Sequence, residues 1–518
     1  MDPVDPVAPA DPAVQAAAGP RRGPGGSHKA LGAALGAAGR ADYAPMNAAV
    51  LSDSERWPTL EAAAVRQVHR LYDEPGAPVW THRCGDRLTS ADLDRLARLG
   101  ERLRDGSLAQ RRTGAYPRAA LVDSVIRPAL GSVPRYRALA RAGRLGPGAR
   151  LEDLPVANRE DLRRDLASHV ALDADLDRIV QGTSSGSTGA AIRFPVDPLA
   201  PGADVVLLRW WLERLGVSWE LDALRPERLA LVQVVDQGRA FTYASAMTAH
   251  GPGARMARIN LDPAAWTAPD DPARWLARHD PLVLSSAPLP LLRLADTAPG
   301  LRPRAVVSGT SHLSARARTR LERTWEAPVL DVYGLEECGM VAVDPDGAGW
   351  RIVPGVHVEV LDAAGDPLPA GERGRLVVTT GMNPAMPLLR YDTGDRGSVA
   401  SRHDPRAPGG AELLITALEG RGTVRYENAW GDWVPSVSLT QVLQARGAAV
   451  WSVHQRADGH LDVLAAGVTG TLGPDLAREL RTGLATLLGQ PVSVHELADS
   501  HRSSRRFTSA LSGHDGLD

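Results

Sequence analysis

Three short polar segments, in a fixed order along the chain, have residue types suited to binding a nucleotide. The first contains five hydroxyl side chains and two glycines, Thr183-Ser184-Ser185-Gly186-Ser187-Thr188-Gly189. The second is Tyr333-Gly334-Leu335-Glu336-Glu337, with adjacent carboxylates, and the third is Arg390-Tyr391-Asp392-Thr393-Gly394-Asp395. Their order and spacing, more than any one of them, indicate a site for a nucleoside triphosphate beside a second substrate.

Each segment has its own chemistry. In the loop 183–189, successive backbone N–H groups can point at one anion, and the hydroxyls add further donors. It is not a Walker loop, because it lacks Gly-Lys-Ser/Thr. Glu337, which follows a strand-like apolar run, could hold Mg²⁺ that bridges phosphates. Asp395 could accept hydrogen bonds from two ribose hydroxyls. Taken singly, the three also fit a flexible connector, a solvated acidic turn and a plain Thr-Gly-Asp turn.

The composition argues against several kinds of partner. Among the 518 residues, Lys+Arg number 59 and Asp+Glu 61, for a formal net charge of −2. This balance gives no attraction to nucleic acid or to an anionic membrane. The two cysteines, Cys84 and Cys338, are too few for a disulfide framework. The chain contains no apolar run of about 20 residues, the length needed to span a bilayer. We expect a cytoplasmic protein that binds neither nucleic acid nor membrane.

Helical and strand patterns alternate from about residue 50, which predicts an α/β fold. Apolar runs of strand length are followed by an antiparallel region and then by a smaller α+β unit. We expect helices at 92–99, 204–215 and 474–488, and strands at 229–235, 282–285, 305–308, 328–332, 356–361, 375–380, 449–454, 461–466 and 492–496. The fold class is therefore α/β, with a large multi-sheet N-terminal domain that contains an antiparallel subregion, and a small mobile α+β C-terminal domain.

Three parts are expected along the chain. Residues 1–45 are rich in Ala, Pro and Gly and form a disordered tail. Residues 46–420 form the large nucleotide- and acyl-binding domain. Residues 421–518 form a small lid domain, with a hinge at Gly420-Arg421-Gly422, where paired glycines permit rotation.

Together, the three segments resemble the adenylate-forming superfamily of acyl-CoA synthetases and peptide-synthetase adenylation domains. The closer resemblance is to its phenylacetate–CoA ligase-like and capsule-biosynthesis-like branch. It rests on Ser132-Val133-Pro134-Arg135-Tyr136-Arg137, on the stretch Leu154–Leu162, and on Met386-Pro387-Leu388-Leu389-Arg390. The resemblance is good over about 130–440 and looser in the last unit.

The resemblance implies an enzyme that uses ATP and Mg²⁺ to activate a carboxylic acid as an acyl-adenylate. The acyl group then passes to a thiol, of CoA or a carrier protein, or to an amine. It implies that Thr183–Gly189 bind phosphates, that Glu337 binds the metal and that Asp395 holds the ribose. It also implies nucleotide and acyl contacts for Tyr333 and Gly334 of the second motif, for Ser308, Gly309 and Thr310 before it, and for the hinge residue Arg421.

Departures from the family pattern leave two accounts open. Glu336 stands where the family has Thr or Ser, which removes a hydroxyl and adds a negative charge. The lysine used in adenylation is missing, since the one lysine of the chain is Lys29. Arg505 and Arg506 stand in the corresponding segment. Arginine keeps the positive charge but not the compact shape of an ammonium group. Either the replacement is harmless, or the chain binds a nucleotide or adenylate without forming one.

The acid and the acceptor are not identified by the sequence. The stretch 234–243 falls where the family builds its acyl pocket. Phe241 and Tyr243 could pack an aromatic acid, and Asp236 points to a polar one, although the same residues also fit a solvated loop.

Overall fold

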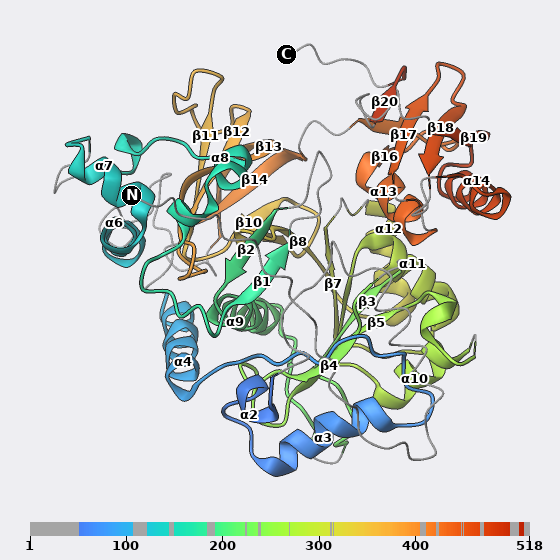
Figure 1. Cartoon of the computed structure of the whole chain (residues 1–518), viewed down its shortest axis with the longest axis horizontal. Coiled ribbons are helices and arrows are strands. Elements are labelled where there is room, and N and C mark those ends of the chain that lie inside the picture. Colours follow the sequence, from blue (N-terminus) through green and yellow to red (C-terminus); the bar gives the residue numbers. More distant parts are fainter. Residues whose placement is uncertain are drawn as a thin grey trace, which may run out of the picture.

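A large mixed sheet forms the centre of the molecule (Figure 1). The computed structural model describes residues 51–106, 122–144, 150–183, 192–222, 225–236, 240–268, 270–310, 313, 315–404, 411–420, 424–446, 448, 450–466, 471–497 and 507–511. Within these, the sheet has 12 strands in the order β11-β12-β13-β14-β10-β9-β8-β7-β6-β3-β5-β4. The predicted tail lies outside the described residues.

One half of this sheet is parallel apart from its edge strand β4. The parallel strands are β3 (Leu231–Val235), β5 (Arg255–Asn260), β6 (Val283–Ser286), β7 (Ala305–Gly309) and β8 (Val329–Leu335), and β4 is Tyr243–Ala246. Helices α10 (Asp271–His279), α11 (Pro288–Thr297) and α12 (Ala315–Trp325) lie between successive strands. Their apolar sides pack on one face of the sheet, around buried Trp275, Leu291 and Leu321.

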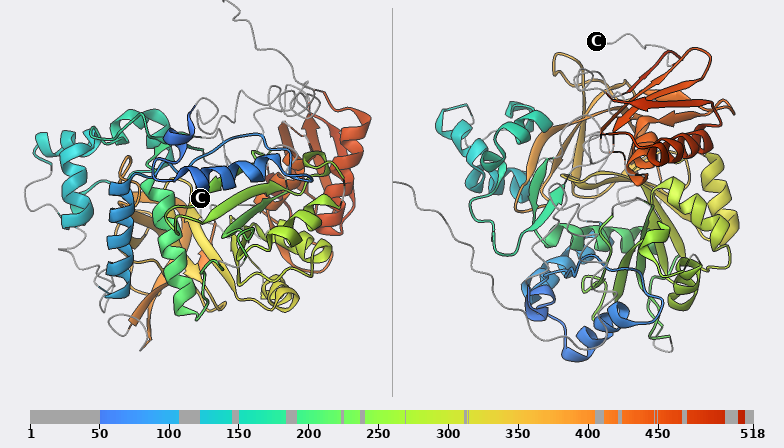
Figure 2. Two further views of the ribbon diagram at one scale, coloured as in Figure 1. Left: turned by 90° about the horizontal axis from the view of Figure 1, so that it is seen from below. Right: turned by 45° about the vertical axis from the view of Figure 1, so that its right-hand side comes forward.

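The opposite face packs against a long apolar helix, α9 (Leu199–Arg214), which buries Leu207, Trp211 and Leu212. Helix α4 (Ser90–Arg104) runs beside α9, as the left view of Figure 2 shows. The two can approach closely because Gly202 of α9 has no side chain. A Cβ atom there would lie 2.7 Å from Leu96 of α4. The sequence therefore predicted the α/β architecture and, within it, helices at 92–99 and 204–215, but not the individual helices of the α10–α12 layer.

The other half of the sheet is antiparallel. It contains β9 (Gly339–Asp344), β10 (Trp350–Ile352), β11 (Val356–Leu361), β12 (Gly374–Thr380), the long β13 (Leu388–His403) and β14 (Ala411–Glu419). The predicted pairing of 356–361 with 375–380 is confirmed, with Val356 opposite Thr380. This half brings β13 toward β8 through β14, β10 and β9.

The region before β3 adds helices and one small sheet. The helices are α2 (Asp53–Arg56), α3 (Ala62–Asp73), α6 (Arg127–Ser132), α7 (Pro134–Arg141) and α8 (Arg159–Arg164), with π or 3-10 turns at Val122–Ile126, Leu151–Asp153 and Leu166–His169. A further 3-10 turn, Pro263–Ala265, follows β5. Strands β1 (Val180–Thr183) and β2 (Arg193–Val196) form an antiparallel pair, with Thr183 opposite Arg193. The polar loop of the first motif therefore joins two paired strands.

The C-terminal part forms its own small sheet and core. Strands β17 (Val450–Gln455), β18 (Leu461–Ala466), β19 (Val492–Glu496) and β20 (Phe507–Ser509) pair in the order β19-β18-β17-β20. Helices α13 (Ser436–Ala445) and α14 (Pro474–Leu488) and the hairpin β15 (Arg425–Glu427) and β16 (Trp433–Pro435) complete it. Buried Tyr426, Leu443 and Leu484 belong to this core.

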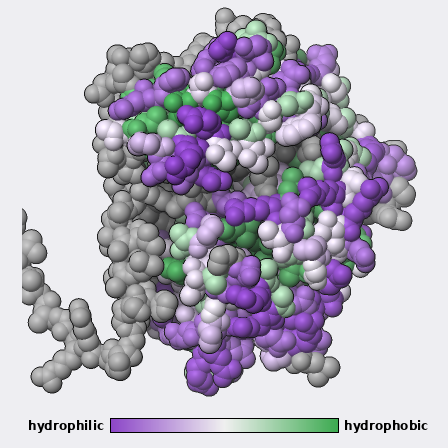
Figure 3. All heavy atoms as spheres, turned by 90° about the vertical axis from the view of Figure 1, so that its right-hand side faces the viewer, coloured by the Kyte–Doolittle hydropathy of each residue, from purple (hydrophilic) through white to green (hydrophobic). Residues whose placement is uncertain are grey.

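The α/β fold class with a small α+β C-terminal unit is thus confirmed. The large region holds one long sheet and the small β1–β2 pair. The mobility of the C-terminal unit, and the division between 420 and 421, stay predictions. Among the described residues, no helix is long and apolar enough to cross a membrane. The side that carries α10 and α14 is largely hydrophilic, and its hydrophobic side chains lie in separate groups (Figure 3).

Candidate functional site

The second motif leaves the large sheet where the parallel half meets the antiparallel half. Strand β8 pairs in parallel with β7 and antiparallel with β9, with an irregularity at Tyr333/Gly334. Gly334 allows the two strands to approach, because a Cβ atom there would lie 2.6 Å from the carbonyl oxygen of Gly339. The carboxylates Glu336 and Glu337 follow directly, at the end of β8. Ligand sites of α/β proteins lie at this edge of the sheet.

The third motif lies within β13 and is held by local hydrogen bonds. Thr393 donates from its hydroxyl to the Leu376 carbonyl (2.9 Å) and accepts from the backbone N–H of Asp395 (3.0 Å). Gly394 has φ +76°, a backbone conformation that glycine adopts without strain. Asp395 is 8% exposed. The Thr-Gly-Asp sequence therefore fixes one carboxylate in a buried position.

Two tyrosine–carboxylate hydrogen bonds join the second and third motifs reciprocally. Tyr333, of the second motif, donates to Asp395 Oδ2 over 2.8 Å. Tyr391, of the third motif, donates to Glu337 Oε1 over 2.7 Å. Tyr391 is fully buried and Glu337 is 4% exposed. Two segments more than fifty residues apart are thus brought together, and each places the carboxylate of the other.

The three stretches that resemble the phenylacetate–CoA ligase-like branch meet around β13. The Tyr136 hydroxyl accepts from the backbone N–H of Leu389 (3.0 Å). The Ala157 N–H donates to the Arg390 carbonyl (2.9 Å). The guanidinium of Arg390 donates to the Leu154 carbonyl (2.9 Å) and pairs with Glu359 (3.1 Å). These stretches therefore support the strand that carries the third motif.

The end of β7 supplies the turn that the sequence predicted beside the nucleotide. Ser308 and Gly309 are the last residues of β7, and Ser308 is fully buried. Thr310 follows with φ +67°, which is unusual for a β-branched residue. Such strain is commonly retained at functional sites.

The three candidate acid-binding residues differ in their surroundings. Asp236 pairs with Arg293 of α11 over 2.6 Å. Phe241 and Tyr243 lie nearly parallel, with ring centroids 5.7 Å apart and planes inclined by 5°. The guanidinium carbon of Arg258 lies 4.3 Å from the Phe241 ring centroid. The aromatic pair is thus adjacent to a cation that the sequence analysis did not single out.

Acidic groups dominate the electrostatics of this edge. Burial first, and then the charge of Glu336, raise the pKa of Asp204, on α9, to about 6, against the Met340 N–H that lowers it. The pKa of Glu336 is itself raised, by desolvation first and by Glu337 second, while Arg258 lowers it. Glu336 is nonetheless exposed to solvent.

Burial also keeps the nearby weak acids protonated. The pKa of Tyr333 lies well above its usual value, because of desolvation first and the charge of Asp395 second. Its hydroxyl is therefore a hydrogen-bond donor at any physiological pH. Burial raises the pKa of the Cys84 thiol to about 12, and Cys338 is buried as well, so neither cysteine is an exposed nucleophile.

The residues present fit Mg²⁺ through one carboxylate. Glu337 is joined through Tyr391 to the motif that carries Asp395, and Mg²⁺ is commonly bound by one or two carboxylates together with substrate phosphates. No group of three or more His, Cys, Asp or Glu residues that could hold a metal occurs in the described part of the chain. Several predicted residues lie outside that part: Ser184, Ser185, Gly186, Ser187, Thr188, Gly189, Arg421, Arg505 and Arg506.

Three residues of this site were missed from the sequence. The sequence marked Tyr391 as a possible site residue, since it lies inside the third motif, but its partner Glu337 is distant in sequence. No sequence pattern marked Arg258 or Asp204, because a lone arginine in a strand and a lone aspartate in a helix are common on surfaces. The fold alone brings them to the carboxyl-terminal edge of the sheet.

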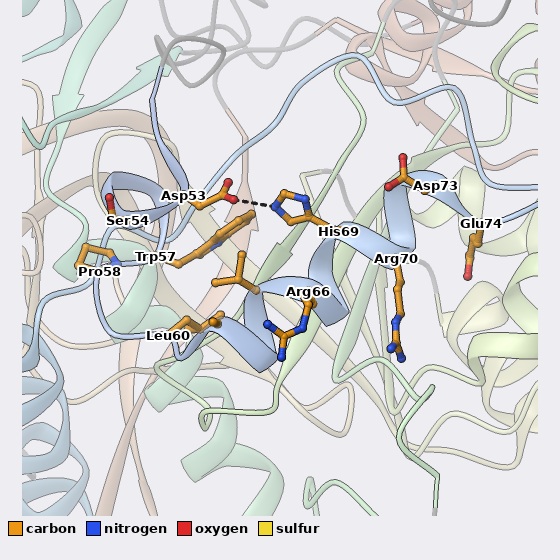
Figure 4. A pocket seen from close by; sticks show the side chains of 12 residues that line it. Asp53, Ser54, Trp57, Pro58, Leu60, Arg66, His69, Arg70, Asp73 and Glu74 are labelled. Carbon is orange, nitrogen blue, oxygen red and sulfur yellow. Dashed lines mark ion pairs between the residues drawn. The ribbon is translucent and has the colours of Figure 1, made fainter. Parts of the chain in front are cut away.

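A separate hollow of about 950 Å³ lies beside α2 and α3 (Figure 4). Trp57, Leu60 and Val65 line its apolar part, and Asp53 pairs with His69 across 2.9 Å. None of the residues predicted from the motifs lines this hollow. We therefore assign the candidate site to the edge of β8 and β13.

One family model matches part of the chain. Residues 221–384 match a family model described as AMP-binding enzyme. The matched segment includes β3 to β12 and the second motif. The match supports the adenylate-forming superfamily that the motifs predicted, while the phenylacetate–CoA ligase-like branch stays a prediction. No curated protein matches the chain by sequence.

Solved structures of ligases and adenylation domains are distantly similar. A 2-hydroxyisobutyryl-CoA ligase with 2-HIB-AMP shares 17% identity, covering 82% of this chain and 91% of that one, with a TM-score of 0.45. The anthranilate CoA ligase AuaEII with anthranoyl-AMP shares 14% identity, covering 62% and 63%, with a TM-score of 0.35. McyG A-PCP with phenylalanyl-adenylate shares 12% identity, covering 62% of each chain, with a TM-score of 0.34. These likenesses say nothing about the acid or the acceptor of this chain.

Proposed function

We propose that this protein activates a carboxylic acid with ATP as an acyl-adenylate and then transfers the acyl group to a thiol. The observation that carries the proposal is the reciprocal pair of hydrogen bonds Tyr333–Asp395 and Tyr391–Glu337. It holds one carboxylate suited to a ribose and one suited to a metal ion in a single site.

In the first half-reaction, a carboxylate oxygen of the acid attacks the α-phosphorus of ATP. The bond between that phosphorus and the bridging oxygen breaks, and pyrophosphate leaves with the electron pair. Asp395 binds the ribose hydroxyls and Glu337 holds Mg²⁺. Mg²⁺, when bound, neutralises charge on the phosphates. The loop Thr183–Gly189 donates to phosphate oxygens, and Arg505 or Arg506 supplies the positive charge that lysine supplies in the family.

In the second half-reaction, a thiol sulfur attacks the acyl carbonyl carbon and its proton passes to solvent. The bond between that carbon and the phosphate oxygen breaks, and AMP leaves with the electron pair. CoA and a carrier-protein thiol both satisfy this chemistry, and an amine acceptor would follow the same course. Residues 46–420 would bind the nucleotide and acid. Residues 421–518, with Arg421 at the hinge, would rotate between the half-reactions.

A second candidate function rests on the replacements at Glu336 and at the missing lysine. In it, the protein binds a nucleotide or an acyl-adenylate and does not form one. Acid-dependent exchange of labelled pyrophosphate into ATP separates the two candidates, because exchange requires reversible adenylate formation. Exchange with any acid of a broad panel supports the ligase. AMP binding without exchange favours the second candidate.

A matched pair of variants sharpens this test. Arg506→Lys restores the family residue type, and Arg506→Ala removes the charge. We expect exchange within about tenfold of wild type for the lysine variant and a loss of about a hundredfold or more for alanine. Unchanged exchange in both variants, and in the same pair at Arg505, would remove these arginines from the proposal.

A further inference from the structure

One register row of the large sheet carries polar side chains across four neighbouring strands. Tyr243 of β4 pairs with Arg258 of β5. Arg258 also pairs with Gln233 of β3, and Gln233 pairs with Ser285 of β6. Residues paired directly across a sheet share one face. The row lies two residues before the carboxyl ends of β3 and β5, on the side of the sheet edge where the second motif leaves β8.

Arg258 is the charged member of this row, and it has no carboxylate partner among the described residues. Its Nη1 donates to the Gln233 side-chain oxygen over 2.9 Å. Its Nε is buried and meets no hydrogen-bond acceptor in the described part of the chain. Two better-buried arginines, Arg351 and Arg390, do have carboxylate partners. Arg255 bonds main-chain carbonyls instead. A half-buried guanidinium with an unused N–H is costly unless a ligand completes it.

The immediate neighbours of Arg258 are aromatic. Its guanidinium carbon lies 4.3 Å from the Phe241 ring centroid, and Phe241 stacks on Tyr243. The His82 ring lies edge-on to Phe241, with centroids 5.8 Å apart. Burial raises the pKa of Tyr243 to about 12, so its hydroxyl stays protonated. The surroundings therefore offer apolar ring surfaces with one positive charge among them.

The charge of Arg258 also reaches the second motif. It lowers the pKa of Glu336 against the desolvation that raises it. Two charged groups shift the pKa of Glu336: the positive charge of Arg258 lowers it and the negative charge of Glu337 raises it. The aromatic row and the end of β8 therefore belong to one electrostatic neighbourhood.

We propose that Arg258 is a specificity-determining residue and that the activated acid carries a second carboxylate, which Arg258 binds through its guanidinium N–H groups. The body of the acid lies against Phe241 and Tyr243. The substrate class is thus a dicarboxylic acid with an aromatic or apolar body. This inference rests on the proposed function, which supplies the site for the first carboxylate.

The test compares acids that differ only in the second carboxylate. Adipate is paired with hexanoate, and 4-carboxyphenylacetate with phenylacetate. Binding of each acid to the full chain is measured by calorimetry with AMP present. We expect one diacid to bind about tenfold or more tightly than its monoacid in the wild type. Arg258→Gln removes this preference, and Arg258→Lys, which loses the forked contact, keeps only part of it.

Arg320→Gln is the matched control. Arg320 lies on α12, is half exposed and pairs with Asp296, away from the aromatic row. This variant keeps the wild-type preference, and thermal melting checks that each variant folds. Should Arg258→Gln not fold, Arg258→Lys decides, because an unchanged preference in it contradicts the forked contact.

The inference is overturned if the wild type binds each diacid no better than its monoacid, or if the preference survives in Arg258→Gln. Failure of the proposed function has a different signature, since the wild type would then bind no AMP and exchange no pyrophosphate. A diacid preference that Arg258→Gln removes supports the role of Arg258 in either case. If Arg258 serves only to neutralise the charge of Glu336, then Glu336→Gln and Arg258→Gln both change the affinity for AMP. The wild type then shows no preference for diacids, which overturns the inference.

Discussion

Tyr391 donates its hydroxyl hydrogen to Glu337 over 2.7 Å, inside a region where both residues are buried. A buried carboxylate with a fixed donor on one oxygen presents its other oxygen in a defined direction. The reverse contact, from Tyr333 to Asp395, orients the Asp395 carboxylate in the same way. Each motif therefore positions a carboxylate of the other.

Tyr391→Phe removes one donor and leaves a buried carboxylate oxygen without its partner. We expect the free energy of unfolding to fall by about 1–3 kcal/mol, because the desolvation of that oxygen is no longer offset. Binding of Mg-ATP should weaken more than binding of AMP, since Glu337 is assigned to the metal. Urea unfolding and calorimetry measure the two effects.

Tyr426→Phe is the control for that variant. Tyr426 is equally buried and donates to the Val453 carbonyl over 3.0 Å in the C-terminal core. It should lose comparable stability and leave the ratio of Mg-ATP to AMP affinity unchanged. An equal change of this ratio in both variants would mean that Tyr391 acts through stability alone.

Gly334→Ala places a Cβ atom 2.6 Å from the Gly339 carbonyl oxygen, so β8 and β9 must separate. We expect a loss of about 1–3 kcal/mol in the free energy of unfolding, as for other overpacked sites. Gly300→Ala, at a position with open space, should change stability by less than about 0.5 kcal/mol. Similar losses in both variants would contradict the close approach at Gly334.

The raised pKa of Asp204 makes stability depend on pH. Its pKa is about 6 in the folded chain and near 3.8 when unfolded. Between these values the folded state binds more protons, so the free energy of unfolding falls as pH rises from about 4 to 6. The fall due to this group is at most about 3 kcal/mol.

Asp204→Asn should therefore be more stable than the wild type at pH 7 and show a shallower decline between pH 4 and 6. In the wild type the Met340 N–H donates a hydrogen bond to the Asp204 carboxylate over 3.2 Å, and the amide oxygen of the variant can still accept it. Denaturant unfolding at a series of pH values measures this. A variant with the wild-type slope would show that Asp204 is not the group that titrates.

Local patterns predicted much of the fold. The strands Val356–Leu361, Leu461–Ala466 and Val492–Glu496 and the helix Pro474–Leu488 have the predicted bounds. Their periodicity is strong and their ends carry Gly, Pro or Asp. Strand β8 extends to Leu335, past the predicted Val332, because pairing with β9 continues through the motif. A pattern of local residues contains no information on that partner.

The candidate site was predictable in its motifs and not in its contacts. Glu337 and Asp395 were identified by residue type and spacing, whereas their tyrosine partners come from the other motif in each case. The positions of Tyr391 and Arg258 depend on the order of strands in the sheet. Sequence order does not determine that arrangement without the tertiary packing that brings β13 toward β8.

The account rests most directly on Asp395 as the ribose-binding carboxylate. The decisive measurement is calorimetric binding of AMP and of 2′,3′-dideoxy-AMP to the wild type and to Asp395→Ala. We predict that the wild type binds AMP about a hundredfold more tightly than the dideoxy compound, and that Asp395→Ala binds both weakly and alike. AMP binding that is unchanged in Asp395→Ala, or absent from the folded wild type, would contradict the nucleotide site.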